Sequence, residues 1–149
     1  MKYILSILLF IIPGYLVADN IQTQYLSLPK KELNCLVKNA YYEAFGEGEI
    51  GILLVNQVVF NRTKDNKFCK TIYERKQFSW TTQKVKRIPK EVYNELASLI
   101  HAQYHGFIDV PERFKNIYYF HEKSIKPKWS YRKKVAGRYR NHIFYEETV

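Results

Sequence analysis

The segment EIGILLVNQVVFNR, residues 49–62, places apolar side chains on nearly every face of a helix. A surface helix is apolar on one side only, whereas a helix that is apolar all round lies inside its domain. The β-branched residues would also suit a strand, but the run is long and does not alternate. We therefore predict a buried central helix with other elements packed around it. Its polar members, Asn56, Gln57 and Asn61, need hydrogen-bond partners inside the protein.

Further patterns on both sides supply the packing partners of this helix. Apolar residues recur at helical spacing after Pro29, at Leu33, Leu36, Val37, Ala40 and Ala44, and then Gly46 and Gly48 break the pattern. A third helix is predicted from Pro89 to Gly106, and residues 63–88 are predicted to be loop with short helical turns. The aromatic segments NIYYFH and NHIFY predict two short strands. The expected fold is mainly α (α+β), one helical domain with a small β element near the C-terminus.

The first 18 residues have the order of a secretory signal, with one lysine, an apolar run from Tyr3 to Ile12 and a small residue, Ala18, at the expected cut. Leu16 is large for the position two residues before a cut, so an uncleaved signal-anchor is the alternative. We expect an exported protein of the periplasm or cell envelope, either secreted or held by its N-terminus. Residues 19–28 are predicted to be a leader and residues 29–149 the folded domain.

Cys35 and Cys69 are the two cysteines of the chain. Two thiols in an exported protein form a structural disulfide more often than a reactive pair. The alternative is two free, buried cysteines that behave as small apolar residues. A disulfide is the prediction.

The net charge of the chain is +10, and much of the positive excess lies in residues 123–140. Such an excess indicates an anionic partner, which could be nucleic acid, acidic lipid or an anionic cell-wall polymer. Outside the cytoplasm, an anionic envelope surface is the expected partner. A basic nuclease, which the charge and His142 would suit, is a competing class. The signal segment and the lack of a clustered set of metal-binding acids weigh against it, so no nucleic acid partner is expected.

Glu43 lies near the end of the first predicted helix, on the rim of its apolar face. Burial beside Leu36, Ala40 and the neighbouring aromatic residues disfavours the charged carboxylate, as does the negative end of the helix dipole. Both effects raise the pKa of a glutamate, and a general acid must keep its proton near neutral pH. The alternative is a solvated glutamate at a helix end. Glu47, between two glycines, suits a cap or a supporting role.

The string YYEAFGEGEIGILLVNQVVFNR resembles the signature of the SleB-type cell wall hydrolase family, in which an E-A-x-G-E core precedes an apolar helix that ends in Asn-Arg. Three further segments occur in the order of that family: FCKTIY, QFSW at residues 77–80, and a C-terminal YFH…P-x-W…H-I-F-Y. Together these segments span about residues 33–145, nearly the whole of the predicted domain.

The resemblance implies a lysozyme-like, transglycosylase-like catalytic domain over residues 29–149 that acts on the MurNAc-GlcNAc strands of peptidoglycan. The catalytic acid of the family opens the E-A-x-G-E motif, which is Glu43 here, while Glu47 and Asn61 fall at positions of motif support. The implied route is lytic transglycosylation, in which Glu43 protonates the glycosidic oxygen and then accepts the proton of the muramyl C6 hydroxyl. Neither a cofactor nor a metal is expected, and the protein is expected to be a monomer.

Substrate-binding residues also follow from the resemblance. Gln77 and Ser79 of QFSW supply an amide and a hydroxyl beside two aromatic rings, as sugar recognition needs. Tyr119 and His121 lie in the segment that lines the cleft in the family, although packing is an equal alternative for both. Some members carry Tyr-Asn at the end of this segment, where this chain has His121-Glu122.

Three alternatives remain open at this point. Glycosidases that consume water use two carboxylates, so a muramidase or glucosaminidase would need Glu74 or Glu122 to order the water. A noncatalytic basic module that binds the cell wall would need no acid at all. Among enzymes, a phage endolysin and a bacterial enzyme that remodels its own wall both fit the sequence.

One further pattern, His101 and His105, places two imidazoles one helical turn apart, as zinc ligands can be. Ala102 stands where an H-E-x-x-H helix carries its glutamate, and the sequence offers no evident third ligand. The pair is therefore not predicted to hold a metal.

Overall fold

The computed structural model describes residues 27–147, so the predicted signal segment and almost all of the leader lie outside the described residues. The helices are α2 (Lys30–Ala44), α3 (Gly48–Arg62), α4 (Phe68–Tyr73) and α5 (Lys90–Tyr104). Short 3-10 helices join them: η1 (Phe45–Glu47), η2 (Ser79–Thr82), η3 (Glu112–Phe114) and η4 (Lys128–Arg132). The strands are β1 (Ile117–Glu122), β2 (Val135–Tyr139) and β3 (His142–Glu146). The predicted mainly α (α+β) fold is confirmed.

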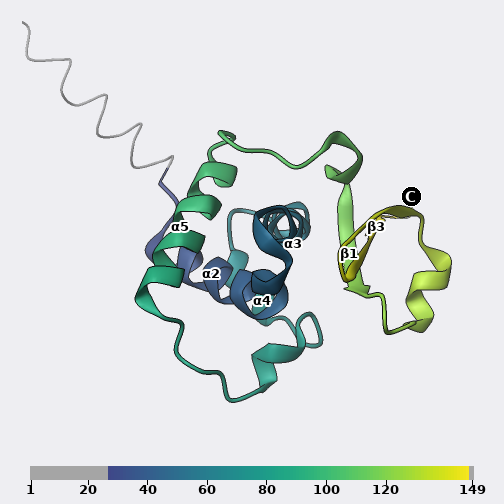
Figure 1. Cartoon of the computed structure of the whole chain (residues 1–149), viewed down its shortest axis with the longest axis horizontal. Helices are drawn as coiled ribbons and strands as arrows, with labels where there is room; N and C mark the ends of the chain where they lie inside the picture. The colour runs from purple at the N-terminus through teal and green to yellow at the C-terminus, as the bar shows by residue number, and fades with distance from the viewer. Residues whose placement is uncertain (1–26, 148–149) are drawn as a thin grey trace, which may run out of the picture.

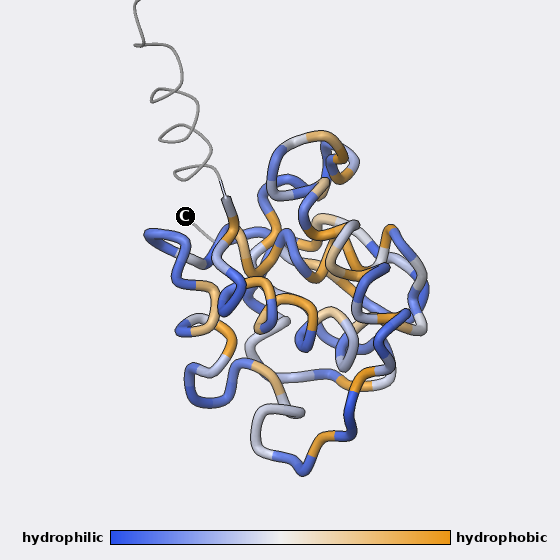
Figure 2. The backbone as a smooth tube through the Cα atoms, turned by 90° about the vertical axis from the view of Figure 1, so that its left-hand side faces the viewer, coloured by the Kyte–Doolittle hydropathy of each residue, from blue (hydrophilic) through white to orange (hydrophobic). Residues whose placement is uncertain are grey.

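Helix α3 occupies the middle of the molecule, as its sequence predicts. It contacts α2, α4 and α5, and it also packs against β1 of the sheet (Figure 1). Its buried residues are Gly51, Ile52, Leu53, Leu54, Val55, Asn56, Val58 and Val59. Only the first turn departs from this pattern, since the side chain of Ile50 is 44% exposed. Hydrophobic stretches concentrate where the helices meet, and hydrophilic stretches make up much of the outer chain (Figure 2).

Two of the three polar residues of α3 fasten it to the sheet. The side-chain amide of Asn61 donates to the carbonyl oxygens of Lys115, at 2.7 Å, and Ile117, at 2.8 Å, and it accepts from Gln57 at 2.8 Å. These bonds tie the end of α3 to the start of β1. Asn56 differs, because its amide is fully buried among apolar side chains and has no hydrogen-bond partner in residues 27–147. The expectation of an internal partner is therefore wrong for Asn56.

The sheet has three antiparallel strands in the order β1-β3-β2, one more strand than the sequence predicts. Strands β1 and β3 are the two aromatic segments that were predicted. Strand β2 is an edge strand with only partly buried or exposed residues, so its sequence lacks a clear alternation. Gly137 lets β2 approach the core, because a Cβ atom there would lie 2.6 Å from the ring of Phe114.

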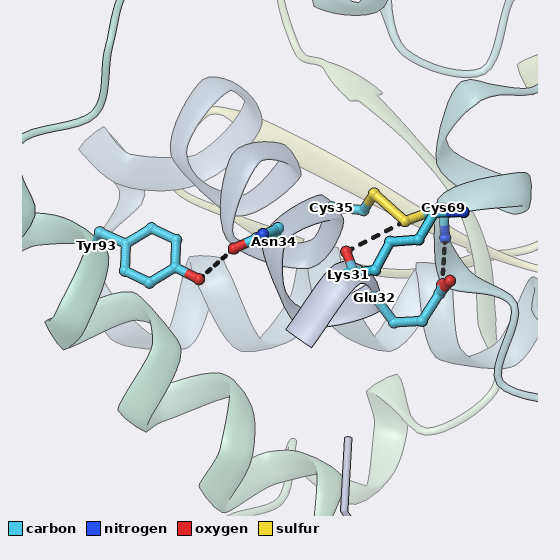
Figure 3. Close-up of a disulfide and its surroundings, with 6 residues drawn as sticks. All are labelled: Lys31, Glu32, Asn34, Cys35, Cys69 and Tyr93. Carbon is cyan, nitrogen blue, oxygen red and sulfur yellow. Dashed lines mark hydrogen bonds between the residues drawn. A yellow bond between two sulfur atoms is a disulfide. The ribbon is translucent and has the colours of Figure 1, made fainter. Parts of the chain in front are cut away.

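The predicted disulfide is present and joins α2 to α4 (Figure 3). The Cα atoms of Cys35 and Cys69 are 5.3 Å apart. Beside the bridge, the backbone N–H of Cys69 donates to the Glu32 carboxylate at 2.7 Å. On another side of α2, the Tyr93 hydroxyl of α5 donates to the side-chain oxygen of Asn34 (Figure 3). Helix α2 is thus fastened to two neighbours, which fixes the helix that carries Glu43.

In the part of the chain that the structure describes, no helix combines the length and the apolar character needed to cross a membrane.

Candidate active site

An open cleft of about 1050 Å³ separates the helical part of the molecule from the sheet. Its walls come from the ends of α2 and α3, from residues 73–83, and from β1 with the segment that follows it. Small-molecule sites usually enclose about 300 to 1,000 Å³, so this cleft has room for a chain of several sugar units.

Glu43 opens into this cleft from the last turn of α2 and is half-buried. Burial raises the pKa of its carboxyl group from 4.5 to about 7, and the negative charge of Glu122 contributes to the same shift. The sequence predicts the direction of this pKa shift and its larger cause. It does not predict the second cause, because Glu122 is brought to Glu43 only by the packing of the sheet against the helices.

The predicted binding residues come together around Glu43. Gln77, Ser79, Tyr119 and His121 all line the same cleft, although they belong to two segments about 40 residues apart. Gln77 is half-buried and Ser79 is exposed. The amide and the hydroxyl are thus open to a ligand in the cleft, and their binding roles stay predictions.

The ring of His121 forms part of the cleft wall, but neither of its nitrogens is free to bind a ligand. Its Nδ1 lies 2.7 Å from the carbonyl oxygen of Glu122, which can only accept, so Nδ1 carries the proton. Its Nε2 then accepts from the Tyr145 hydroxyl at 2.7 Å, and the two rings stack with centroids 5.3 Å apart. Both ring nitrogens are therefore engaged within the protein.

Glu47 and Asn61, predicted to support the motif, lie outside the residues that line the cleft. The Glu47 side chain is buried and accepts two hydrogen bonds from Asn141 in the turn between β2 and β3. His142 lies 3.9 Å from the same carboxylate, but burial lowers the pKa of His142, which favours the neutral ring. Glu47 thus holds the β2–β3 turn against η1, next to the end of α2.

Three aromatic residues near the cleft belong to the buried core. Trp80, Phe144 and Tyr145 are all buried, and the indole N–H of Trp80 donates to Asn39 at 3.0 Å. Trp129 is different, since it is 38% exposed and lines the cleft next to Tyr119, with ring centroids 5.8 Å apart.

The sequence predicts no role in the site for Arg62, the last residue of α3. Its half-buried side chain instead lines the cleft, with Cζ 5.9 Å from the centre of the Tyr119 ring. Burial lowers the pKa of its guanidinium, while Tyr119 and Glu74 act in the opposite direction. The available signal was its place as the last residue of the central helix, next to Asn61, which anchors that helix to β1.

The histidine pair of α5 shows no metal-site geometry. The rings of His101 and His105 stack, with centroids 5.9 Å apart. Within residues 27–147, no group of three His, Cys, Asp or Glu side chains gathers as a metal site would require.

A helical domain whose open cleft combines one half-buried carboxylic acid of raised pKa with amide, hydroxyl and aromatic groups has the chemistry of a glycan-cleaving enzyme. The sequence model of the Cell Wall Hydrolase family matches residues 46–145, most of the chain. The chain therefore belongs to this family, which confirms the resemblance seen in the sequence and makes it an enzyme that acts on peptidoglycan. The match begins just after Glu43 and so does not include it. No curated protein and no solved structure matches the chain.

Proposed function

We propose that this enzyme cleaves the glycan strand of peptidoglycan between MurNAc and GlcNAc by lytic transglycosylation, with Glu43 as the single acid and base. The observation that carries the proposal is a carboxyl group with a pKa of about 7 in an open cleft. Near neutral pH such a group populates both its protonated and its ionised form, and efficient acid–base catalysis needs a pKa near the working pH.

The reaction uses the two forms of Glu43 in turn. The neutral carboxyl group donates its proton to the glycosidic oxygen, and the bond from that oxygen to C1 of the muramyl sugar breaks. The carboxylate then accepts the proton of the C6 hydroxyl while O6 bonds to C1 and closes a 1,6-anhydro ring. Glu43 ends in its starting form, and no water is consumed.

The rest of the cleft suits a sugar chain. Gln77 and Ser79 provide neutral groups that can donate to and accept from hydroxyl and acetamido groups. Tyr119 and Trp129 provide aromatic rings beside them. We assign these four side chains to substrate binding, and His121 to the wall that supports them.

Hydrolysis is the second candidate, and one observation favours it. Glu122 lines the same cleft and lies close enough for its charge to affect Glu43. Glycosidases that use water need a second carboxylate, on the other side of the scissile bond from the acid. Glu74 also lines the cleft and is the other acid that could order a water.

Mass spectrometry of the muropeptides released from purified sacculi separates the two reactions. Transglycosylation gives anhydro-muramyl ends, which are lighter by one water than the reducing ends left by hydrolysis. Glu43→Gln should abolish release of either product, and Glu49→Gln, at an exposed position outside the cleft, is the matched control. Reducing ends from the parent would favour hydrolysis, and full activity of Glu43→Gln would remove Glu43 from the mechanism.

The same variant tests the assignment of catalysis to Glu43 against the alternative of a noncatalytic wall-binding module. A binding module needs only the basic surface, so Glu43→Gln should keep its affinity for sacculi while it loses lysis. Binding of sacculi without lysis by the parent and the variant alike would support the binding module, whereas equal lysis by both would contradict only the role of Glu43.

We also propose that the protein is exported and works as a monomer in the periplasm or envelope, as a phage endolysin or as a bacterial wall-remodelling enzyme. The signal-like order of the first 18 residues supports export. Exposed cations at Lys123 and Arg138 suit contact with an anionic envelope surface. Cell fractionation of the tagged full-length chain tests the location, and recovery in the cytoplasm would contradict it.

A further inference from the structure

Positive charge gathers at one wall of the cleft. Lys133 lies over the ring of Tyr119, with Nζ 3.6 Å from the ring centre, and Arg62 lies 5.9 Å from the same centre. Trp129, next to Tyr119, also lines a smaller hollow of about 340 Å³ together with Lys128, Arg132 and Lys133. We call Arg62, Lys128 and Lys133, with the two aromatic rings between them, the cationic wall.

The charges of the cationic wall are not neutralised by the protein. In the described part of the chain, no carboxylate lies within 4.0 Å of Arg62, Lys128 or Lys133, although other lysines do form such pairs. Lys134, the next residue along, is 2.9 Å from the Glu146 carboxylate. Glu74 affects Arg62 through its charge but forms no ion pair with it. The cationic wall therefore keeps a net positive charge, with Arg62 in the cleft and Lys128 and Lys133 in the smaller hollow that shares Trp129 with it.

The position of the Arg62 guanidinium is energetically unfavourable unless a ligand pairs with its charge. Its guanidinium is half-buried, and the structure gives it no hydrogen bond to a side chain or carbonyl within residues 27–147. A buried charge that lacks a partner is unfavourable, whereas a charge that meets an anion in the same place is stabilised. An arginine guanidinium can form a bidentate pair with a carboxylate, in which two parallel N–H groups donate to its two oxygens. A carboxylate in the cleft would satisfy these donors.

Only one of the two sugars of peptidoglycan carries a carboxylate. GlcNAc carries no charge, whereas the muramyl sugar carries a lactyl arm that ends in a carboxyl group. That carboxyl group is either free or extended by a peptide with carboxylates of its own. We propose that the cationic wall binds a carboxylate on the lactyl arm of the muramyl residue next to Glu43. This inference rests on the proposed function, because it assigns a substrate contact in the same cleft.

Binding of the charged arm would set the register of the strand. The strand alternates two kinds of linkage, and a 1,6-anhydro ring can form only on a muramyl residue whose C6 hydroxyl is near the catalytic group. A cationic wall that adjoins the cleft at Tyr119 and Trp129 would select the muramyl sugar as the residue that lies at Glu43. The charge of the arm then governs both affinity and the choice of linkage.

Three forms of the glycan strand test the inference with the full-length protein. The first carries stem peptides. The second has had its peptides removed by an amidase, which leaves free lactyl carboxylates. The third is the second after coupling of its carboxyl groups to methylamine, which removes the charge. We expect kcat/KM to be about tenfold lower on the third form, as the loss of one charged hydrogen-bonded contact implies.

The variant Lys128→Met/Lys133→Met should remove most of this discrimination. Its kcat/KM should fall by about tenfold on whichever charged form the parent prefers, and by much less on the neutral form. Lys126→Met is the matched control, since Lys126 is exposed on the same segment but lines neither the cleft nor the smaller hollow. Activity of the double variant on the uncharged, methylamine-coupled strand is a further control. If the substitutions displaced Tyr119, activity would fall on all three substrates alike.

The outcomes separate this inference from the proposed function. If kcat/KM is highest on the strand with stem peptides alone, the ligand is a carboxylate of the peptide. If kcat/KM is equal on the strands with and without peptides, the ligand is the lactyl arm that both carry. Equal cleavage of all three forms by the parent, or an equal loss on all three in the double variant, would overturn the inference and leave the proposed function in place. No cleavage of any form by the parent would overturn the proposed function and the inference with it.

Discussion

Glu47 and Asn141 are joined by two hydrogen bonds although 94 residues separate them in the chain. The backbone N–H of Asn141 donates to one carboxylate oxygen of Glu47 and its side-chain amide donates to the other, both over 3.1 Å. The contact fastens the β2–β3 turn to the short helix η1. Since η1 directly follows the helix that carries Glu43, the same contact helps to hold the sheet wall of the cleft against the helical wall.

Replacement of Glu47 by alanine should therefore destabilise the fold. The change removes the acceptor of two hydrogen bonds at a buried charged group, and we expect a loss of about 2 kcal/mol in the free energy of unfolding. Urea unfolding of the parent and the variant measures this loss. Glu49→Ala, two residues away at an exposed position, is the control and should change stability by about 0.5 kcal/mol or less. Equal losses in the two variants would contradict a specific role for Glu47.

Gly51→Ala should disturb Glu47 from the other side. A Cβ atom at Gly51 would lie 2.3 Å from the Cβ atom of Glu47, so the new methyl group must displace the η1 turn. Overpacking of this kind costs about 1 to 3 kcal/mol. Gly46→Ala is the matched control, because nothing lies within 4 Å of its Cβ position. Thermal unfolding should show a lower midpoint for Gly51→Ala only, and a similar shift in both variants would contradict the steric reason.

Loss of the Cys35–Cys69 disulfide should lower stability more than either change. The two cysteines are 34 residues apart, and closing a loop of that length stabilises a folded chain by about 3 to 4 kcal/mol through the entropy of the unfolded state. Urea unfolding with and without a reducing agent measures the difference. A Cys35→Ala/Cys69→Ala variant should be insensitive to the reducing agent, and an unchanged midpoint for the reduced parent would contradict the prediction.

Glu43 should make the protein less stable as the pH rises. Its pKa is about 7 in the folded state against an ordinary value of 4.5, so the folded state binds more protons between these pH values. Stability therefore falls from about pH 4.5 to pH 7, and Glu43→Gln avoids this loss. At pH 8 the variant should be more stable than the parent by up to about 3 kcal/mol, with no gain at pH 4. Glu95→Gln, at an exposed position of α5, keeps Glu43 and should lose stability with rising pH as the parent does.

Local sequence patterns were enough to predict the helices and the character of Glu43. The apolar run of α3 marks a buried helix whatever packs around it, and Glu43 inherits partial burial from its place on the rim of α2. Both depend on residues within one or two helical turns. The direction of the pKa shift of Glu43 followed from this local burial, which is the larger cause in the structure.

Features that depend on distant segments could not be predicted in the same way. The bonds between Glu47 and Asn141 and the field of Glu122 at Glu43 exist only once the sheet packs on the helices. Strand β2 forms at an edge, where burial imposes little alternation on the sequence. For Asn56 the sequence predicted a contact that the structure lacks. The rule that a buried amide has a hydrogen-bond partner does not hold there.

The pH dependence of catalysis should reveal the electrostatic coupling of Glu43 to Glu122. As a general acid Glu43 must start protonated, so kcat/KM on sacculi fragments should fall as the pH rises through about 7. Glu122→Gln removes a negative charge that raises this pKa, so the descending limb should move to lower pH. It should not reach 4.5, because burial, the larger cause, remains. Glu74→Gln is the control from the same cleft and should leave the limb in place.

The same profile separates the two reactions that the cleft could support. If Glu122 only tunes Glu43, the Glu122→Gln variant should keep most of its maximal rate at low pH. If Glu122 orders a water as a general base, the maximal rate should instead fall by about 10² or more at every pH, since general bases contribute about 10²- to 10⁴-fold. A descending limb that stays at about pH 7 in Glu122→Gln would contradict the coupling itself.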